Sequence, residues 1–181
     1  MTILTTARLR LRGPEDGDAE ALRAYHACNA ERFAPWEPAQ SADVADHRAW
    51  IAAQLAQDGP ERPTTFLAFA NGGVELVGVV GLSGFTTAPA GAMVHYTVDG
   101  SYEGRGYASE AVRAVLDYAF DAFALAQISA YYHPDNARSG RLLERLGFRV
   151  MAVTPAIPGF EHVMKPQVWA ALARAEHGAA G

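Results

Sequence analysis

The chain has 181 residues, half of them apolar, which is enough for one domain with a substantial core and excludes a peptide-sized scaffold or a disordered chain. Its formal net charge is −5 and only 19% of residues are charged, which argues against nucleic-acid binding by general electrostatics and favours a basic or amine partner. Cys28 is the single cysteine, which excludes an internal disulfide or a cysteine-based zinc site and favours a reducing cytoplasm.

The N-terminal part predicts a strand followed by two helices. Residues 7–12 alternate apolar residues with arginine, a period typical of a half-buried edge strand. A helix is expected after Asp16 or Asp18, with Cys28 as a small core residue, and a second over 44–57. No stretch has the pattern of a signal peptide or the length of a membrane span, so we expect a soluble protein without a membrane partner.

The middle of the chain predicts three consecutive antiparallel strands. Residues 65–70 and 74–82 flank Asn71-Gly72-Gly73 and form a hairpin in this interpretation. Residues 83–91 are rich in Gly, Thr, Pro and Ala, and we expect a loop there, followed by a strand over 92–98.

The C-terminal half alternates helices and strands. Four elements are expected: an amphipathic helix from about 108, a strand over 127–132, a helix over 136–146 and a strand over 148–153. Pro166 lacks a ladder donor, so a strand should end near it or bulge there, and the tail from Ala170 should be helical at first. No repeat or linker marks a boundary, which predicts a single domain over 1–181.

A loop with two glycines joins the strand over 92–98 to the helix that follows. Gly104 and Gly106 flank Arg105, and the loop opens directly onto the helix. Free amides of the first helical turn and the positive end of the helix dipole can bind a phosphate there, and glycine lets the backbone approach closely. The strand, loop and helix together favour a phosphate site over a solvated turn.

A second motif begins at Asn136, at the expected N-cap of a helix. Arg138, Arg141 and Arg145 follow at spacings of three and four, so they share one helix face. That face is either solvated, with Glu144 balancing part of its charge, or it binds a phosphate-bearing ligand.

The two motifs together resemble the GNAT superfamily of N-acetyltransferases, which bind acetyl-CoA through a (Q/R)-x-x-G-x-G/A loop and an N-x-x-S/A helix start. Here Ser101 stands at the first position of the loop pattern. Within the superfamily, GxGYAxEA, PxNxxSxxLLxxLGF and FAPWEP over 33–38 are similar to the ribosomal-protein-alanine N-acetyltransferase type. The resemblance implies an α/β fold with a mixed, mostly antiparallel sheet, splayed in the middle and flanked by about four helices.

The resemblance also implies which residues bind acetyl-CoA. The strand end would pair with the pantetheine arm, an amide near Val98 would face the thioester oxygen, and the glycine loop would hold the pyrophosphate. Ser139 would lie near the sulfur, and Arg138 or Arg141 would reach a CoA phosphate. The implied cofactor-binding residues are Tyr96, Thr97, Val98, Gly104, Arg105, Gly106, Tyr107, Ala108, Asn136, Ser139 and Arg141.

The implied reaction is direct attack of an amine on the thioester, which needs a base for the ammonium and an acid for the leaving thiolate. The position of the superfamily's general tyrosine holds Leu143, so Ser139 is the better candidate acid, unless it only bonds the backbone in the first turn of its helix. Glu161, beside His162 in the connection between the last strands, is a candidate base. His95 is another candidate on the strand beside the expected acetyl position, unless its side chain, opposite in parity to Tyr96, faces the other side of the sheet.

The acceptor is expected to bind near the first two helices, with Phe33 and Trp36 as candidate contacts unless they only plug the space between the helices. Residues 1–62 hold ten acidic and seven basic residues, which suits a cationic amine. The first hypothesis is that the acceptor is a protein N-terminus of the ribosomal-protein kind. The second is that it is a small-molecule amine or an antibiotic. The third is that the protein is a non-catalytic acyl-CoA-binding module. We expect no metal site and a monomer or homodimer.

Overall fold

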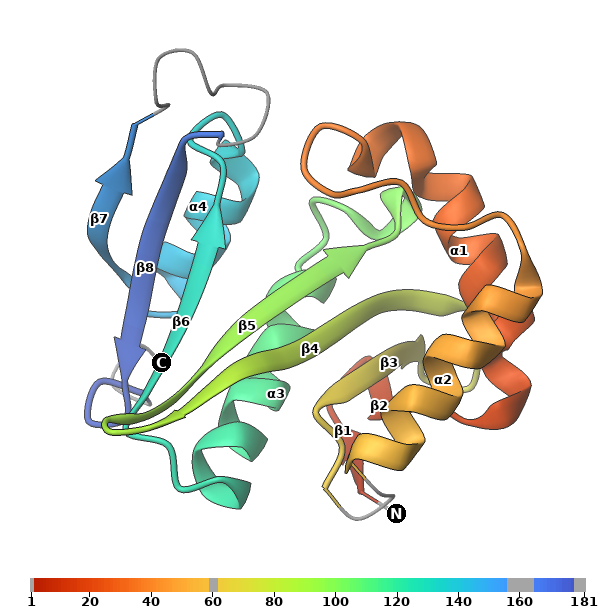
Figure 1. Cartoon of the computed structure of the whole chain (residues 1–181), viewed down its shortest axis with the longest axis horizontal. Coiled ribbons are helices and arrows are strands. Elements are labelled where there is room, and N and C mark those ends of the chain that lie inside the picture. The colour runs from red at the N-terminus through yellow and green to blue at the C-terminus, as the bar shows by residue number, and fades with distance from the viewer. Residues whose placement is uncertain (1, 59–61, 156–164, 178–181) are drawn as a thin grey trace. The chain divides into compact units, whose positions relative to one another are not determined.

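The computed structural model describes residues 2–58, 62–155 and 165–177 (Figure 1). These residues form an α/β fold with one mixed sheet in the strand order β1-β2-β3-β4-β5-β6-β8-β7, which confirms the predicted fold class. In chain order the elements are β1 (Ile3–Thr5), β2 (Leu9–Arg12), η1 (Asp16–Asp18), α1 (Ala19–Phe33), α2 (Val44–Asp58), β3 (Thr65–Ala70), β4 (Leu76–Thr87), β5 (Ala90–Val98), η2 (Gly100–Tyr102), α3 (Tyr107–Ala122), β6 (Gln127–Tyr132), α4 (Ala137–Arg145), β7 (Arg149–Thr154) and β8 (Gln167–Ala173).

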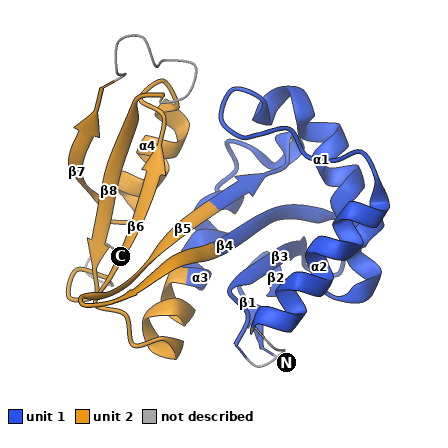
Figure 2. Cartoon of the chain, viewed as in Figure 1, with its two compact units in different colours: residues 1–81, 96–115 blue, residues 82–95, 116–181 orange. Residues whose placement is uncertain are grey.

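The chain divides into two compact units (Figure 2). One consists of Met1–Gly81 with Tyr96–Val115, and the other of Leu82–His95 with Leu116–Gly181. Strands β4 and β5 and helix α3 each contribute residues to both units. No helix in the described ranges has the length and apolar character that crossing a membrane requires.

The first unit begins with two short strands where the sequence pattern predicts one. β1 and β2 pair antiparallel with Leu4 opposite Leu11, and Thr6 closes the turn between them. The Thr6 amide donates to the Leu9 carbonyl, and the Leu9 amide donates to Thr6 Oγ1, both at 2.9 Å. Ala7 and Arg8 therefore lie in a turn, and β1 takes the edge position that was expected for residues 7–12.

Helices α1 and α2 bury an apolar cluster against this part of the sheet. Leu22, Tyr25 and Ile51 are at most 4% exposed and pack with Leu67 and Leu76 of the strands. The expectation that Cys28 is a core residue is wrong, because its side chain is exposed. The buried stripe of α1 continues from Leu22 and Tyr25 to Asn29, seven residues after Leu22, which turns Cys28 away from the core.

In the second unit, β4 and β5 continue through residues expected to form a loop. β4 runs to Thr87 and β5 begins at Ala90, so the connection is only two residues long. The ring of Phe85 lies 5.0 Å from that of Phe123, and the Thr86 hydroxyl donates to the Pro89 carbonyl across the turn at 2.7 Å. An aromatic side chain and threonines suit a strand, and here they outweigh the Gly- and Pro-rich composition.

Strand β6 pairs with β5 in parallel only from Gly91–Gln127 to Met93–Ser129, although both strands are longer than three residues. On its other side β6 pairs antiparallel with β8, which also pairs with β7. β8 starts directly after Pro166 and runs to Ala173, so the expected helical start of the tail is wrong. Alanine is a good helix former, but β8 has a partner strand on each side, and that pairing decides its structure.

Candidate functional site

The C-terminal end of β5 is held closely by its neighbours in the first unit. A Cβ added at Gly78 of β4 would lie 2.6 Å from the Thr97 carbonyl oxygen, so only glycine permits this approach. The Tyr25 hydroxyl of α1 donates to Thr97 Oγ1 at 2.8 Å. Burial raises the pKa of Tyr25 far above its ordinary value, although the hydrogen bond to Thr97 opposes this, so the hydroxyl stays protonated. The strand end expected to meet the pantetheine arm is thus fixed on two sides.

Asn29 of α1 ties down the chain where β5 ends. Its Nδ2 donates to Asp99 Oδ2 at 2.7 Å and to the Tyr25 carbonyl at 2.9 Å, while its Oδ1 accepts from the Gly100 amide at 3.0 Å. Asp99 also accepts from the Ser101 amide at 2.8 Å. Partial burial opposes ionisation of Asp99, but these hydrogen bonds outweigh it and lower its pKa. Asn29 was absent from the sequence candidates because a small polar residue inside a helix gives no pattern.

Arg32, one turn further along α1, adds a second anchor for the same loop. Its Nη2 donates to Glu103 Oε1 at 2.6 Å, and both side chains are partly buried. Its stem passes Gly100, where an added Cβ would come within 3.2 Å of Arg32 Cδ. α1 therefore holds both the start and the middle of the loop from β5 to α3.

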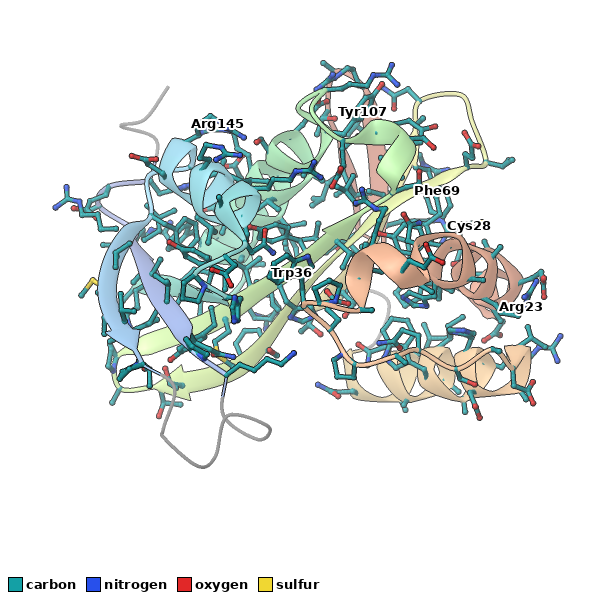
Figure 3. All side chains as sticks on the ribbon, turned by 90° about the horizontal axis from the view of Figure 1, so that it is seen from above. Arg23, Cys28, Trp36, Phe69, Tyr107 and Arg145 are labelled. Carbon is teal, nitrogen blue, oxygen red and sulfur yellow. The ribbon has the colours of Figure 1, made fainter. Side chains whose placement is uncertain are left out.

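The two glycines of the loop adopt backbone angles that other residues rarely adopt. Gly104 and Gly106 have φ angles of +68° and +82°, which favour glycine. No heavy atom lies within 4 Å of a Cβ built at Gly104, so that side of the loop is open. The loop leads into the first turn of α3 at Tyr107 (Figure 3), whose first amides have no acceptor within the helix. The Arg105 guanidinium lies 5.4 Å from the centre of the Tyr107 ring.

A further residue reaches the loop from the turn between β1 and β2. Arg8 donates through Nη1 to the Arg105 carbonyl at 2.7 Å, and its Nε donates to Glu110 Oε2 at 2.6 Å. Glu110 lies in the first turn of α3. Neither residue was a candidate from the sequence, because Arg8 matched an exposed strand face.

In the second unit, Asn136 caps α4 as its sequence position predicts. Its Oδ1 accepts from the Ser139 amide at 3.1 Å, and the Ser139 side chain is half-buried. Gly140 allows α4 to approach β6, since a Cβ there would come within 3.0 Å of the Tyr132 ring. Cofactor binding by Asn136 and Ser139 stays a prediction, because the cap itself explains the asparagine.

The arginines of α4 and His95 are also in the second unit. Arg138, Arg141 and Arg145 are exposed on the helix, opposite the buried Leu142 and Leu143. That arrangement suits a solvated face and a phosphate contact equally. Arg145 is labelled in Figure 3. The His95 side chain is exposed, yet the protein around it desolvates the ring enough to lower its pKa.

The acceptor candidates differ in their surroundings. Phe33 packs partly on the α1–α2 core, with its ring 5.7 Å from that of Tyr25. Trp36 lies in the loop after α1 and is 43% exposed (Figure 3), so more of its surface is open to a ligand. Glu161 and His162 lie outside the described residues. No group of three or more His, Cys, Asp or Glu suited to a metal ion occurs in the ranges that the structure describes.

A profile of the acetyltransferase (GNAT) domain matches residues 8–149, which include the anchored loop and the capped helix described above. The chain belongs to the GNAT acetyltransferase family. It is therefore an acetyl-CoA-dependent acetyltransferase, and acetyl-CoA is its co-substrate.

Relatives of this GNAT enzyme include the [ribosomal protein uS5]-alanine N-acetyltransferase of Escherichia coli. The two are 30% identical over 149 residues, 80% of this chain and 77% of the relative. A ribosomal-protein-S5-alanine acetyltransferase from Vibrio fischeri has a similar fold, with a TM-score of 0.82 at 22% identity over 98% of this chain and 99% of that one. RimJ of Mycobacterium smegmatis, solved in complex with CoA-disulfide, has a TM-score of 0.78 at 24% identity over 93% and 83% of the two chains.

Proposed function

We propose that this GNAT enzyme acetylates the α-amine of a protein N-terminus, of the kind found on ribosomal proteins. The observation that carries this proposal is the 30% identity, over four-fifths of the chain, with an enzyme named [ribosomal protein uS5]-alanine N-acetyltransferase. The net charge of −3 over residues 1–62 supports it, since an ammonium group is attracted to an acidic surface.

The geometry of the first unit fits the phosphate end of acetyl-CoA. The positive φ angles of Gly104 and Gly106, the open space beside Gly104 and the start of the 16-residue helix α3 together form a cradle for an anion. Residues 104–108 would hold the pyrophosphate there. Tyr96, Thr97 and Val98 would pair with the pantetheine arm. In the second unit Asn136, Ser139 and Arg141 carry over from the family resemblance as further cofactor-binding residues.

The bound cofactor supplies an acetyl group activated as a thioester. The amide near Val98 would donate to the oxygen on which charge develops, and the rigid anchoring of this strand end keeps that donor in place. Tyr25 and Gly78 provide the anchoring, through the Thr97 side chain and carbonyl respectively. Holding the reactants in line supplies much of the rate.

Two proton transfers complete the reaction. The acceptor must lose a proton before it attacks, because an α-amine with a pKa of about 8 is mostly charged at neutral pH. His95 is a candidate base, since its lowered pKa keeps the imidazole neutral and able to accept a proton. Glu161 is the other candidate base, and Ser139 is the candidate donor to the leaving thiolate.

A transfer assay with purified protein tests the acceptor. Acetyl-CoA is supplied with peptides that differ at the N-terminal residue, with the same peptides already N-acetylated, and with a polyamine, an amino acid and an aminoglycoside. Free CoA and acetylated product are separated by chromatography, because the exposed Cys28 thiol would react with a thiol dye. We expect transfer to free peptide N-termini and none to the blocked ones. Transfer to small amines alone would identify a small-molecule acetyltransferase, and binding without transfer would identify a non-catalytic module.

A further inference from the structure

Arg8 and Glu110 form a tight pair that joins the N-terminal turn to the start of α3, although 102 residues separate them. The Glu110 carboxylate uses both oxygens. Its Oε1 accepts from the Thr6 hydroxyl at 2.6 Å and from the Arg8 amide at 2.8 Å, and its Oε2 accepts from Arg8 Nε at 2.6 Å. Partial burial opposes ionisation of Glu110, but these bonds and the Arg8 charge outweigh it and lower its pKa. The carboxylate is therefore ionised at neutral pH.

The same guanidinium lies beside three successive residues, from the end of the glycine loop to the first residue of α3. Arg8 Nη1 donates to the Arg105 carbonyl at 2.7 Å. Arg8 Nη2 lies 3.3 Å from the position that a Cβ would take at Gly106. The Arg8 guanidinium carbon is 4.2 Å from the centre of the Tyr107 ring. Glu110 fixes the orientation of the guanidinium, and the guanidinium in turn contacts the loop backbone.

A loop with glycines at positive φ is free to adopt many conformations unless it is held. Ordering one backbone residue costs about 1–2 kcal/mol, and a ligand that orders the loop itself loses that much affinity. The pair also neutralises a carboxylate in the first turn of α3, where an unpaired negative charge would repel a phosphate. Both effects favour binding of an anion, and neither requires that Arg8 touch it.

We propose that Arg8 and Glu110 are positioning residues, which hold the backbone of residues 105–107 in the conformation that binds the pyrophosphate of acetyl-CoA. This inference rests on the proposed function, in which residues 104–108 bind that pyrophosphate. The pair sets the affinity for the phosphate-bearing half of the cofactor and leaves the chemistry at the thioester unchanged.

The experiment compares acetyl-CoA with S-acetylpantetheine, which carries the same thioester but lacks the phosphates together with the adenosine. Arg8→Gln, Arg8→Lys and Glu110→Gln are measured beside Arg10→Gln, which removes the same charge from an exposed position on β2. Calorimetry gives the Kd, and steady-state kinetics give kcat and KM for both acetyl donors. Thermal unfolding shows which variants are folded.

The loss of a charge-assisted hydrogen-bond network predicts a rise of about 10- to 100-fold in the acetyl-CoA Kd and KM for Arg8→Gln and Glu110→Gln. We expect kcat at saturating acetyl-CoA and the KM for S-acetylpantetheine to change less than about twofold. Arg8→Lys keeps the charge but lacks the planar fork that contacts Glu110 and Arg105 together, so it should resemble Arg8→Gln. Arg10→Gln should bind as the wild type does.

Three results would overturn the proposal. One is an unchanged acetyl-CoA affinity in folded Glu110→Gln, the variant that best preserves side-chain shape and serves if Arg8→Gln is unfolded. Another is an equal loss with both donors, which would indicate a general structural defect. The third is full activity of Arg8→Lys, which would assign the effect to charge alone. If the wild type itself binds acetyl-CoA no better than S-acetylpantetheine, the phosphate-loop assignment in the proposed function fails as well, and the two failures are thereby distinguished.

Discussion

Gly78 offers a direct test of how closely β4 approaches the end of β5. It is buried in β4 opposite Ala68 of β3, and its backbone has an ordinary φ that alanine also adopts. In Gly78→Ala the new methyl carbon would lie 2.6 Å from the Thr97 carbonyl oxygen and 3.5 Å from Val98 Cα. Carbon and oxygen do not approach below about 3 Å without repulsion, so the backbone of one strand must move.

The free-energy change has two opposing parts. Replacing glycine by alanine restricts the unfolded chain and stabilises the fold by about 0.4–1 kcal/mol. Overpacking costs about 1–3 kcal/mol, and the upper part of that range applies here because the contact is with backbone. Thr97 cannot yield easily, since Tyr25 holds its hydroxyl. The net loss is about 1–2 kcal/mol, which lowers Tm by roughly 2–8 °C for a chain of this size.

Thermal unfolding followed by circular dichroism measures this loss, with Gly17→Ala as the matched control. No heavy atom lies within 4 Å of a Cβ at Gly17, so the control reports the unfolded-state effect alone and should be neutral or slightly stabilising. The acetyl-CoA affinity of Gly78→Ala should fall as well, because the displaced backbone belongs to the predicted pantetheine strand. A Tm for Gly78→Ala equal to or above that of Gly17→Ala would refute the close approach.

Three further changes test contacts within the first unit. Tyr25→Phe removes the hydrogen bond to Thr97 and should cost about 1 kcal/mol of unfolding free energy in urea, and an unchanged midpoint would contradict the contact. Asp18→Asn breaks the buried pair in which Asp18 accepts from Arg12 at 2.6 and 2.8 Å. The free energy of unfolding in urea should fall by about 3 kcal/mol, and a fall of less than about 1 kcal/mol would mean that water screens the pair. His26 has a pKa lowered from 6.5 to about 4, first by burial and then by the charge of a neighbouring histidine, so the unfolded chain binds its proton more readily. The free energy of unfolding should therefore fall by about 1–2 kcal/mol, after allowance for solvent screening, as pH drops from about 6.5 towards 4. His26→Gln should flatten that part of the profile of unfolding free energy against pH. A profile identical to that of the wild type would exclude His26 as the source of this pH dependence.

The structural features of the two motifs that the sequence predicted correctly depend on local chemistry. A glycine at positive φ, an asparagine that caps a helix and an apolar face repeating at three and four residues are each determined within a few positions. Gly104 and Gly106 have positive φ angles, Asn136 accepts from the Ser139 amide as expected, and the helix after the loop begins one residue before Ala108. These features need no knowledge of the rest of the fold.

The secondary-structure predictions were wrong where strand pairing outweighs the residue composition of a segment. The composition around Ser83–Gly84 predicts a loop, and the alanines of β8 predict a helix. In the structure Ser83 and Gly84 lie within β4, and β8 has β6 and β7 on its two sides. A strand that gains ladder hydrogen bonds along both edges tolerates residues of low strand propensity, because packing and pairing dominate that preference. A single sequence does not reveal which strands become neighbours.

The contacts that fix the glycine loop were missed for a related reason. Asn29, Arg32 and Arg8 all act on residues between Val98 and Glu110 from at least 66 positions away, and each looked ordinary in its own segment. Glu110 shows most clearly the difference between what the local sequence explains and what only the structure reveals. Glu110 lies in the first turn of a helix, where an acidic side chain interacts favourably with the helix dipole. That interaction alone is a sufficient local explanation of the residue. The structure adds that the same carboxylate orients Arg8, and that Arg8 supports the loop backbone. A residue with a sufficient local explanation can therefore also have a long-range role, and the conformation of this glycine loop depends on the residues that hold it as well as on its glycines.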